Sequence, residues 1–357
     1  MKQTSRQDPG GASLTRAVEP SNLLEIRGLK KHYSIVRGLF SSVRGVNRAV
    51  DDVTINLQKG ETLGLVGESG CGKTTIGRSI LRGHTVTDGE IAYRQDDGTT
   101  VDLARLTVNQ MRRYLREVRI VFQDPYSSLN PRMTIFNIVS EALRVNRICS
   151  PAEMKTRVAQ MLERVGLRPD YMNRYPHAFS GGERQRIVIA RALITDPRLV
   201  VCDEAVSALD VSIRGQILKL LEDIQAERDL TYLFVSHDLS VIRHVCDRVA
   251  VMYVGKIVEI APVLELFTKP LHPYTEALLD AVPVPDPRTN SARTRIALKG
   301  EVADSSDPPR GCYFHPRCPY ATALCRTDTP PLRELGDGRH VACHFAESLE
   351  LRGAFKR

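Results

Sequence analysis

One stretch constrains the fold of this chain more than any other. Residues Gly67–Thr75 read GESGCGKTT, which fits the pattern G-x-x-x-x-G-K-[ST]. The stretch follows an apolar run, Thr62–Val66, that predicts a buried strand, and the residues after it can continue as a helix. Glycines at this spacing turn successive N–H groups towards phosphate oxygens, and the N-terminus of the helix adds a positive partial charge. The pattern therefore predicts a nucleoside triphosphate site.

Two side chains of this phosphate-binding loop have an expected role. Lys73 would contact the β- and γ-phosphates, and the hydroxyl of Thr74 would bind Mg²⁺. Cys71 fills a variable position of the pattern, and its side chain has no assigned role. The residues expected to line the nucleotide are Gly67, Glu68, Ser69, Gly70, Cys71, Gly72, Lys73, Thr74 and Thr75.

The composition is that of a globular protein, with 42% hydrophobic and 26% charged residues in a chain of 357. No apolar run approaches the roughly 18 residues of a membrane span, and the first ten residues contain no apolar signal core. We therefore expect the chain to stay in the cytoplasm. The net charge of +8 would permit contact with anionic lipid or nucleic acid, but a diffuse excess is weak support, and we expect no nucleic-acid partner.

Strand and helix patterns alternate from residue 22 to about 268, which predicts an α/β domain with a mainly parallel sheet covered on both faces. Residues 1–21 are polar and predict a disordered tail. The basic segment Val36–Arg48 has no clear period and predicts a mobile loop. Frequent prolines beyond residue 268 exclude long regular elements, so residues 269–357 are expected to form a second, small and loop-rich module.

A second motif combines a strand with two acids. The apolar run Leu199–Cys202 ends in Asp203 and Glu204. Beside a phosphate-binding loop, Asp203 would lie next to Mg²⁺, and Glu204 would polarise an attacking water. The alternative is a strand that ends at a solvated acidic pair.

A third motif lies at the start of a predicted helix and comprises Ser180, Gly181, Gly182 and Glu183. Ser180 can cap the helix, and the glycines expose its N–H groups, which makes a second anion site. A capped helix without a ligand would have the same pattern.

Together these motifs resemble those of the ATP-binding cassette (ABC) ATPases over residues 22–268. The resemblance implies a P-loop NTPase fold with a RecA-like core, an antiparallel β subdomain and a helical subdomain at about residues 124–179. It implies that Glu204, His237 and Gln123 are catalytic, that Gln123 also binds Mg²⁺, and that Tyr33 stacks on adenine. Tyr33 could instead be a half-buried strand residue, and His237 a core histidine. Glu183 and Ala205 depart from the family, which more often has Gln and Pro there.

The resemblance also implies partners. Cassettes of this family work in head-to-tail pairs, in which the signature motif of one subunit covers the ATP of the other. This chain therefore needs a second cassette, identical or distinct, and Gln123 would report the nucleotide state to a membrane partner at the helical subdomain. The expected assembly has two permease subunits and an extracytoplasmic solute-binding protein. The chain would lie at the cytoplasmic face of the bacterial inner membrane.

The C-terminal part resembles the extension of oligopeptide and dipeptide importer ATPases, through LHPYT at residues 271–275 and GCYFHPRCPYA at residues 311–321. The resemblance implies ATP-driven uptake of peptides. Nickel, glutathione or another small solute remain alternative substrates, and a non-transport ATPase is the competing class.

Four cysteines of this extension form a cluster with the spacing C-x5-C-x6-C-x17-C. They suit a [4Fe–4S] cluster, which takes four thiolates. Tetrahedral zinc and inert buried thiols are the alternatives. The cysteines are Cys312, Cys318, Cys325 and Cys343.

Overall fold

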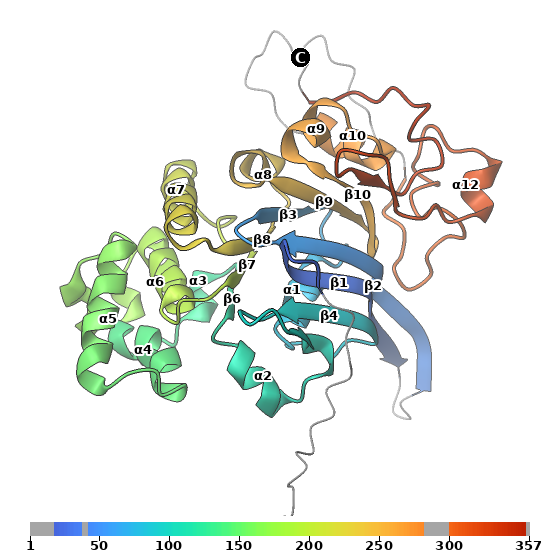
Figure 1. Ribbon diagram of the computed structural model, residues 1–357. Coiled ribbons are helices and arrows are strands. Elements are labelled where there is room, and N and C mark those ends of the chain that lie inside the picture. Colours follow the sequence, from blue (N-terminus) through green and yellow to red (C-terminus); the bar gives the residue numbers. More distant parts are fainter. Residues whose placement is uncertain (1–17, 38–41, 282–299, 355–357) are drawn as a thin grey trace, which may run out of the picture.

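The computed structural model describes residues 18–37, 42–281 and 300–354 (Figure 1). It contains an eight-stranded sheet with the order β11-β12-β10-β9-β3-β8-β7-β6 and a four-stranded sheet with the order β2-β1-β4-β5. Most of the predicted tail, residues 1–17, lies outside the described residues.

The larger sheet consists of β3 (Thr62–Val66), β6 (Val118–Val121), β7 (Leu199–Asp203), β8 (Thr231–Val235), β9 (Arg248–Tyr253), β10 (Lys256–Pro262), β11 (Arg333–Glu334) and β12 (His340–Val341). The smaller sheet consists of β1 (Asn22–Arg37), β2 (Ser42–Gln58), β4 (Asp88–Arg94) and β5 (Thr100–Asp102). The helices are α1 (Lys73–Ile80), α2 (Val108–Tyr114), α3 (Pro125–Ser128), α4 (Ile135–Val145), α5 (Pro151–Arg164), α6 (Gly181–Leu193), α7 (Val211–Arg228), α8 (Leu239–Val245), α9 (Val263–Thr268), α10 (Pro273–Asp280) and α12 (Ala323–Thr327). Short 3-10 turns cover Leu103–Arg105, Pro169–Asn173 and Pro176–Ala178.

The predicted parallel sheet is confirmed by strands β6, β7, β8, β3 and β9, which are parallel to their neighbours in this order. Every residue of β3, β7 and β8 is buried, because helices or the second sheet cover both faces. The carboxyl ends of these strands lie at one edge of the sheet. The loops that follow them therefore come close together.

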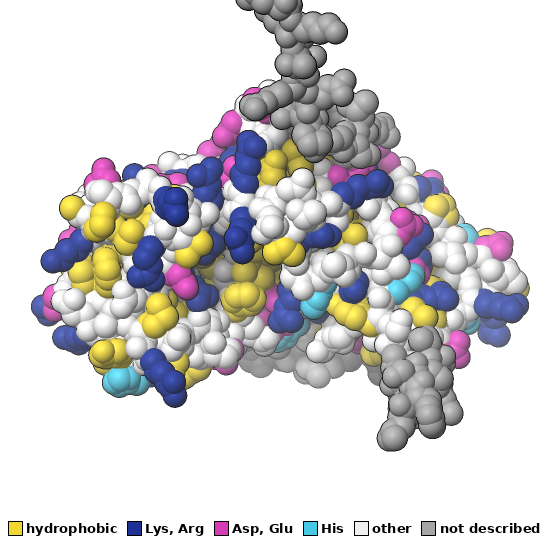
Figure 2. Space-filling view, turned by 90° about the horizontal axis from the view of Figure 1, so that it is seen from below, with side chains coloured by type: hydrophobic (Ala, Val, Ile, Leu, Met, Phe, Trp, Pro, Cys, Tyr) yellow, Lys and Arg dark blue, Asp and Glu magenta, His cyan; other side chains and the backbone are white. Residues whose placement is uncertain are grey.

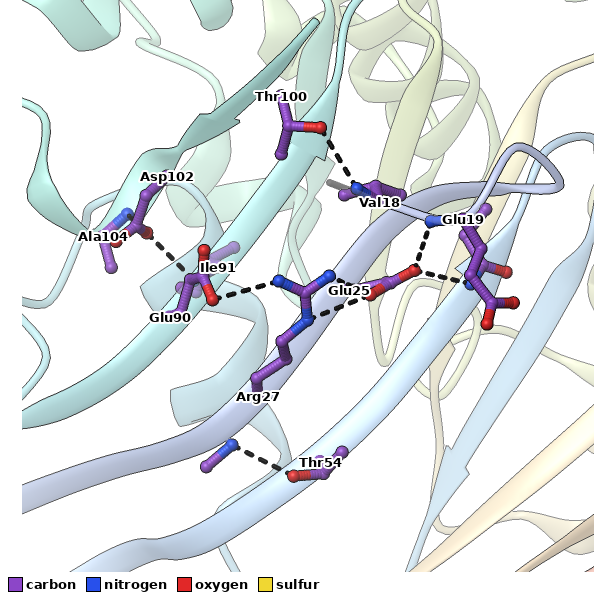
Figure 3. Close-up of polar contacts among 12 residues, drawn as sticks. Val18, Glu19, Glu25, Arg27, Thr54, Glu90, Ile91, Thr100, Asp102 and Ala104 are labelled. Atoms are coloured by element: carbon purple, nitrogen blue, oxygen red, sulfur yellow. Dashed lines mark hydrogen bonds and ion pairs between the residues drawn. The ribbon is translucent and has the colours of Figure 1, made fainter. Parts of the chain in front are cut away.

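The smaller sheet is antiparallel and is tied by charged side chains as well as by its backbone (Figure 3). Arg27 of β1 donates from Nε to Glu25 Oε2 at 3.0 Å and from Nη1 to Glu90 Oε2 of β4 at 3.2 Å. Val18, at the end of the predicted tail, is buried, and its N–H donates to Thr100 Oγ1 at 3.2 Å.

The prediction of a mobile loop over Val36–Arg48 is wrong for the described residues. Strand β1 continues to Arg37, β2 begins at Ser42, and Val36 pairs with Val43. The two strands thus form a long ribbon in which backbone N–H and C=O groups of one strand hydrogen-bond to those of the other. Because these bonds use the backbone, a basic sequence without periodicity gives no sign of them. Residues 38–41 lie outside the described part.

Helices α4, α5 and α6 form a group beside β6 and β7 (Figure 1). Residues 135–166 contain two separate helices, α4 and α5. Ser150 caps α5 by accepting from the Glu153 N–H while the Glu153 carboxylate accepts from Ser150, and Pro151 follows the cap. None of the described helices is long and apolar enough to span a membrane.

The C-terminal extension continues the larger sheet. Strand β12 pairs with β10, where Glu259 lies opposite Val341, and β11 pairs with β12. The regular elements of the described extension are short, and the longest, α10, has eight residues. In Figure 1 the extension lies on the β10 side of the sheet, and the α4–α6 group lies on the other side.

Candidate functional site

The phosphate-binding loop links β3 to α1, and two of its glycines are required by the packing behind it. Gly67 has φ +150°, and a Cβ there would lie 2.1 Å from the Met252 carbonyl oxygen. Gly72 has φ +111°, and a Cβ there would lie 2.0 Å from the Ala49 carbonyl oxygen. A Cβ would clash with these carbonyl oxygens, and residues other than glycine rarely adopt such positive φ angles. The loop therefore keeps its shape only with glycine at both positions.

Lys73 lies inside this loop rather than in solvent. Its side chain is buried, and its Nζ donates to the carbonyl oxygens of Gly67 at 2.8 Å and Glu68 at 2.9 Å. The ammonium group is thus held against the backbone of the loop by these two carbonyl oxygens.

Thr74 and Asp203 form the pair expected to bind Mg²⁺. Thr74 Oγ1 donates to Asp203 Oδ1 at 2.9 Å, which joins the first turn of α1 to the end of β7. Burial raises the pKa of the Asp203 carboxyl, and the Thr74 hydroxyl and the Arg78 charge oppose this rise. A hydroxyl and a carboxylate at one point are oxygen donors of the kind that Mg²⁺ prefers, so the residues present fit the ion.

Glu204, Gln123 and His237 meet at the ends of three segments. Glu204 Oε2 accepts from Gln123 Nε2 at 2.8 Å, and Glu204 Oε1 lies 3.1 Å from His237 Nδ1. The backbone of Glu204 has φ +49°, and its N–H donates to the Val235 carbonyl oxygen at 2.9 Å. A left-handed conformation is uncommon for glutamate and fixes the direction of this side chain at the end of β7.

The signature residues lie at the N-terminus of α6. Ser180 is exposed and caps the helix, since its Oγ accepts from the Glu183 N–H at 3.4 Å and donates to Glu183 Oε2 at 2.8 Å. Glu183 Oε2 also accepts from the Ser180 N–H at 2.9 Å, so the unusual glutamate completes a capping box. Gly181 and Gly182 begin the helix, and a Cβ at Gly182 would lie 2.7 Å from Ile213 Cγ2 of α7.

Tyr33 lies on β1, opposite Asn47 of β2. Its ring meets the ring of His84 edge-on, with centroids 5.7 Å apart, and Lys31 Nζ lies 4.5 Å from its centroid. The ring is partly exposed and is not a core residue.

The four clustered cysteines line one small pocket together with Phe314. Burial, with smaller contributions from Cys325 and Cys343, raises the pKa of Cys312 to about 11 and that of Cys318 to about 12. Within the described residues, no group of three or more His, Cys, Asp or Glu side chains is arranged to hold a metal ion. The thiols therefore surround a shared space without converging on one point.

Two residues that contact the phosphate-binding loop have no signal in the sequence. Arg317 and Tyr274, both in the C-terminal extension, contact Glu68. Both lie in the stretches that marked the extension. No local pattern indicates the contacts, because Arg317 is 249 positions away from Glu68.

Two family models match the chain. One, described as ABC transporter, matches residues 50–207, and one, described as oligopeptide/dipeptide transporter, C-terminal region, matches residues 258–325. Oligopeptide transport ATP-binding protein AppF of Bacillus subtilis is 48% identical over 330 residues, covering 92% of this chain and 99% of AppF. Probable peptide ABC transporter ATP-binding protein y4tS of Sinorhizobium fredii is 49% identical over 322 residues, covering 90% of this chain and 89% of y4tS.

Solved structures match the cassette part. The ATP-binding cassette MJ0796, in a dimeric post-hydrolysis state bound to ADP and Pi, has a TM-score of 0.59 at 26% identity and covers 67% of this chain and 98% of that chain. The cbiO1 protein from Clostridium perfringens has a TM-score of 0.58 at 25% identity and covers 69% of this chain and 91% of that chain. The chain therefore belongs to the ATP-binding proteins of ABC transporters, in the group that carries the oligopeptide/dipeptide transporter C-terminal region.

Proposed function

We propose that this chain hydrolyses ATP to drive the uptake of peptides through a membrane importer. The observation that carries the proposal is a set of three contacts at one edge of the sheet: Thr74 with Asp203, and Glu204 with both Gln123 and His237. The peptide substrate is supported by the names of AppF and y4tS and by the C-terminal family match.

In the proposed binding step, Lys73 exchanges its two carbonyl contacts for the β- and γ-phosphates, and backbone N–H groups of residues 67–75 surround the phosphate chain. Tyr33 stacks on the adenine ring. Thr74, Asp203 and Gln123 would hold Mg²⁺, which would neutralise charge on the phosphate oxygens.

In the proposed hydrolysis step, Glu204 accepts a proton from water as the water oxygen bonds to the γ-phosphorus. The bond from that phosphorus to the β,γ-bridging oxygen breaks, and ADP leaves with the bonding electrons. Gln123 and His237 orient the Glu204 carboxylate, as their contacts with its two oxygens support.

A second cassette completes the proposed site. The exposed Ser180 and the N-terminus of α6 would cover the γ-phosphate of ATP held by the partner cassette, whose own signature would cover the ATP of this chain. The dimeric assembly of the MJ0796 cassette, to which this chain is similar, supports the pairing. Mass spectrometry of the purified complex distinguishes an identical partner from a paralogue.

The helical region at residues 124–179 is the proposed contact with two permease subunits. Large apolar side chains are exposed there at Tyr126, Val145 and Tyr175. Figure 2 shows apolar side chains exposed at the end of the molecule where α4 and α5 lie in Figure 1, and lysine and arginine side chains dispersed over the same face. A permease surface at the cytoplasmic side of the membrane and an extracytoplasmic solute-binding protein complete the proposed assembly, with no nucleic acid.

We also propose that the four clustered cysteines hold a [4Fe–4S] cluster with a structural role. Four thiols around one pocket are the donor set of such a cluster. A single zinc ion has weaker support, because its tetrahedral site requires four donors at about 2.3 Å from one point, and no such group exists among the described residues.

The proposed function is tested with Glu204→Gln in the assembled transporter. The amide can keep both hydrogen bonds, so ATP binding persists, whereas loss of the base slows hydrolysis by about 10²- to 10⁴-fold. The matched control is Glu222→Gln, on the exposed face of α7, which keeps wild-type turnover. Near-normal turnover of Glu204→Gln would show that the base is assigned wrongly.

The substrate and the cluster need separate measurements. Uptake of labelled di- and oligopeptides, nickel and glutathione into vesicles distinguishes the candidate solutes, and energised uptake of a non-peptide alone contradicts the peptide assignment. Anaerobic purification with iron and sulfide analysis tests the cluster, and Cys325→Ser lowers both contents if the thiols are ligands. A purified protein that contains neither iron nor sulfide would show that the four thiols bind no cluster. Zinc bound in stoichiometric amount would show that the four cysteines form a zinc site instead.

A further inference from the structure

The C-terminal extension contacts the phosphate-binding loop directly. The Arg317 guanidinium donates two hydrogen bonds to the Glu68 carboxylate, from Nη1 to Oε2 at 2.7 Å and from Nη2 to Oε1 at 3.1 Å. The Arg317 side chain is only 7% exposed, and that of Glu68 is 27% exposed. A two-pronged ion pair with one partner almost wholly buried is stronger than the usual ion pair at a protein surface.

A second contact fixes the backbone of the same residue. The Glu68 N–H donates to Tyr274 Oη at 2.9 Å. The Tyr274 ring is fully buried and packs against the rings of Tyr253, with centroids 4.7 Å apart, and Phe314, at 5.4 Å. The Arg317 guanidinium lies 6.0 Å from the Tyr253 centroid. The groups that hold Glu68 are therefore themselves held in a rigid aromatic cluster.

Glu68 is an unfavourable residue for a loop that binds a triphosphate. Its carboxylate is negative, and like charges repel strongly in a partly buried site. Its carbonyl oxygen accepts from Lys73 Nζ, so Glu68 is also adjacent to the group that contacts the phosphates. The only cation that forms an ion pair with the Glu68 carboxylate, among the described residues, is Arg317.

We propose that Arg317 is a positioning residue of the ATP site, through which the C-terminal extension sets the affinity for ATP. It neutralises the Glu68 carboxylate and holds it away from the phosphates, while Tyr274 keeps the Glu68 peptide in the orientation that the loop requires. The inference rests on the proposed ATP binding and gives the extension a function at that site.

The test uses the full-length chain in its assembled transporter and measures both binding of a fluorescent ATP analogue and the KM and kcat of ATP hydrolysis. Arg317→Met leaves the Glu68 carboxylate unpaired, so the KM for ATP rises roughly tenfold while kcat changes less than about threefold. Adding Glu68→Gln removes the unpaired charge and returns the KM to within about threefold of wild type. A merely structural arginine would not be rescued by a second substitution.

The matched control is Arg333→Met. Arg333 lies in the same extension and pairs with Glu347 at 2.7 Å, away from the phosphate-binding loop. The Arg333→Met variant is expected to keep the wild-type KM for ATP. If wild type itself does not bind ATP, the proposed function fails; if wild type binds ATP and Arg317→Met does so equally well, only the present inference fails.

Two further outcomes overturn the inference. One is a raised KM in Arg317→Met that Glu68→Gln does not restore. The other outcome comes from the single variant Glu68→Gln, which can be measured even if Arg317→Met does not fold. This variant removes the negative charge of residue 68 while Arg317 keeps its positive charge, so the KM for ATP is equal to or below the wild-type value. An increase of more than about threefold contradicts the role of charge.

Discussion

Replacing Phe314 with alanine tests whether the extension and the cassette share one core. Phe314 is 1% exposed and lies in the extension. Its ring contacts Tyr253 of β9 at a centroid distance of 5.2 Å, Tyr274 of α10 at 5.4 Å and His272 at 5.7 Å. Removing the ring opens a cavity between the last strands of the sheet and the extension.

The expected loss in the free energy of unfolding follows from these contacts. A buried Phe→Ala substitution costs about 3–5 kcal/mol, and three lost ring contacts favour the middle of that range, about 4 kcal/mol. Unfolding entropy is roughly 2.1 cal/mol/K per residue, which gives about 0.75 kcal/mol/K for 357 residues. The melting temperature therefore falls by about 5 °C.

Differential scanning calorimetry on the purified chain provides the measurement. We expect a single main transition that moves down by about 5 °C in Phe314→Ala and by only about 1–2 °C in Phe314→Leu, which keeps most of the volume. Iron content is measured in parallel so that loss of a cluster is not mistaken for loss of packing. The reasoning is refuted if the main transition stays at the wild-type temperature while a separate, smaller transition moves or disappears.

Three other predictions concern the ATP site and its surroundings. Gly72→Ala places a methyl group against the Ala49 carbonyl oxygen at positive φ, so ATP binding weakens roughly 5- to 150-fold for about 1–3 kcal/mol of strain, as a fluorescent nucleotide titration would show. Tyr33→Ala weakens binding of the same analogue while Tyr33→Phe does not, because stacking needs the ring and not the hydroxyl; equal losses contradict adenine stacking. Burial raises the pKa of Asp51, but Lys256 and hydrogen bonds outweigh this and the pKa lies below its ordinary value of 3.8. The stability that this carboxylate contributes is present above pH 3.8 and is lost as the pH falls through its folded pKa, so urea unfolding shows a smaller penalty for Asp51→Asn at pH 3 than at pH 7.

Much of the core fold was predictable because its signals are local. A wholly apolar strand before a glycine-rich loop specifies β3 and α1, and an apolar strand that ends in two acids specifies β7 with Asp203 and Glu204. Such patterns reflect short-range hydrogen bonding and burial, which depend mainly on residues close together in the sequence. Boundaries were less accurate where a ladder of hydrogen bonds between strands decides them, as at the β1–β2 ribbon.

The arrangement of distant segments was decided only by the tertiary structure. Local residue patterns are enough to identify a triphosphate loop, an acidic strand end and a cysteine-rich extension in this chain. Only packing brings Gln123 and His237 to the two oxygens of Glu204, adds β12 to β10, and places Arg317 on Glu68. The physical reason is that these contacts join residues tens to hundreds of positions apart, so their geometry depends on how whole elements pack and leaves no local pattern in the chain.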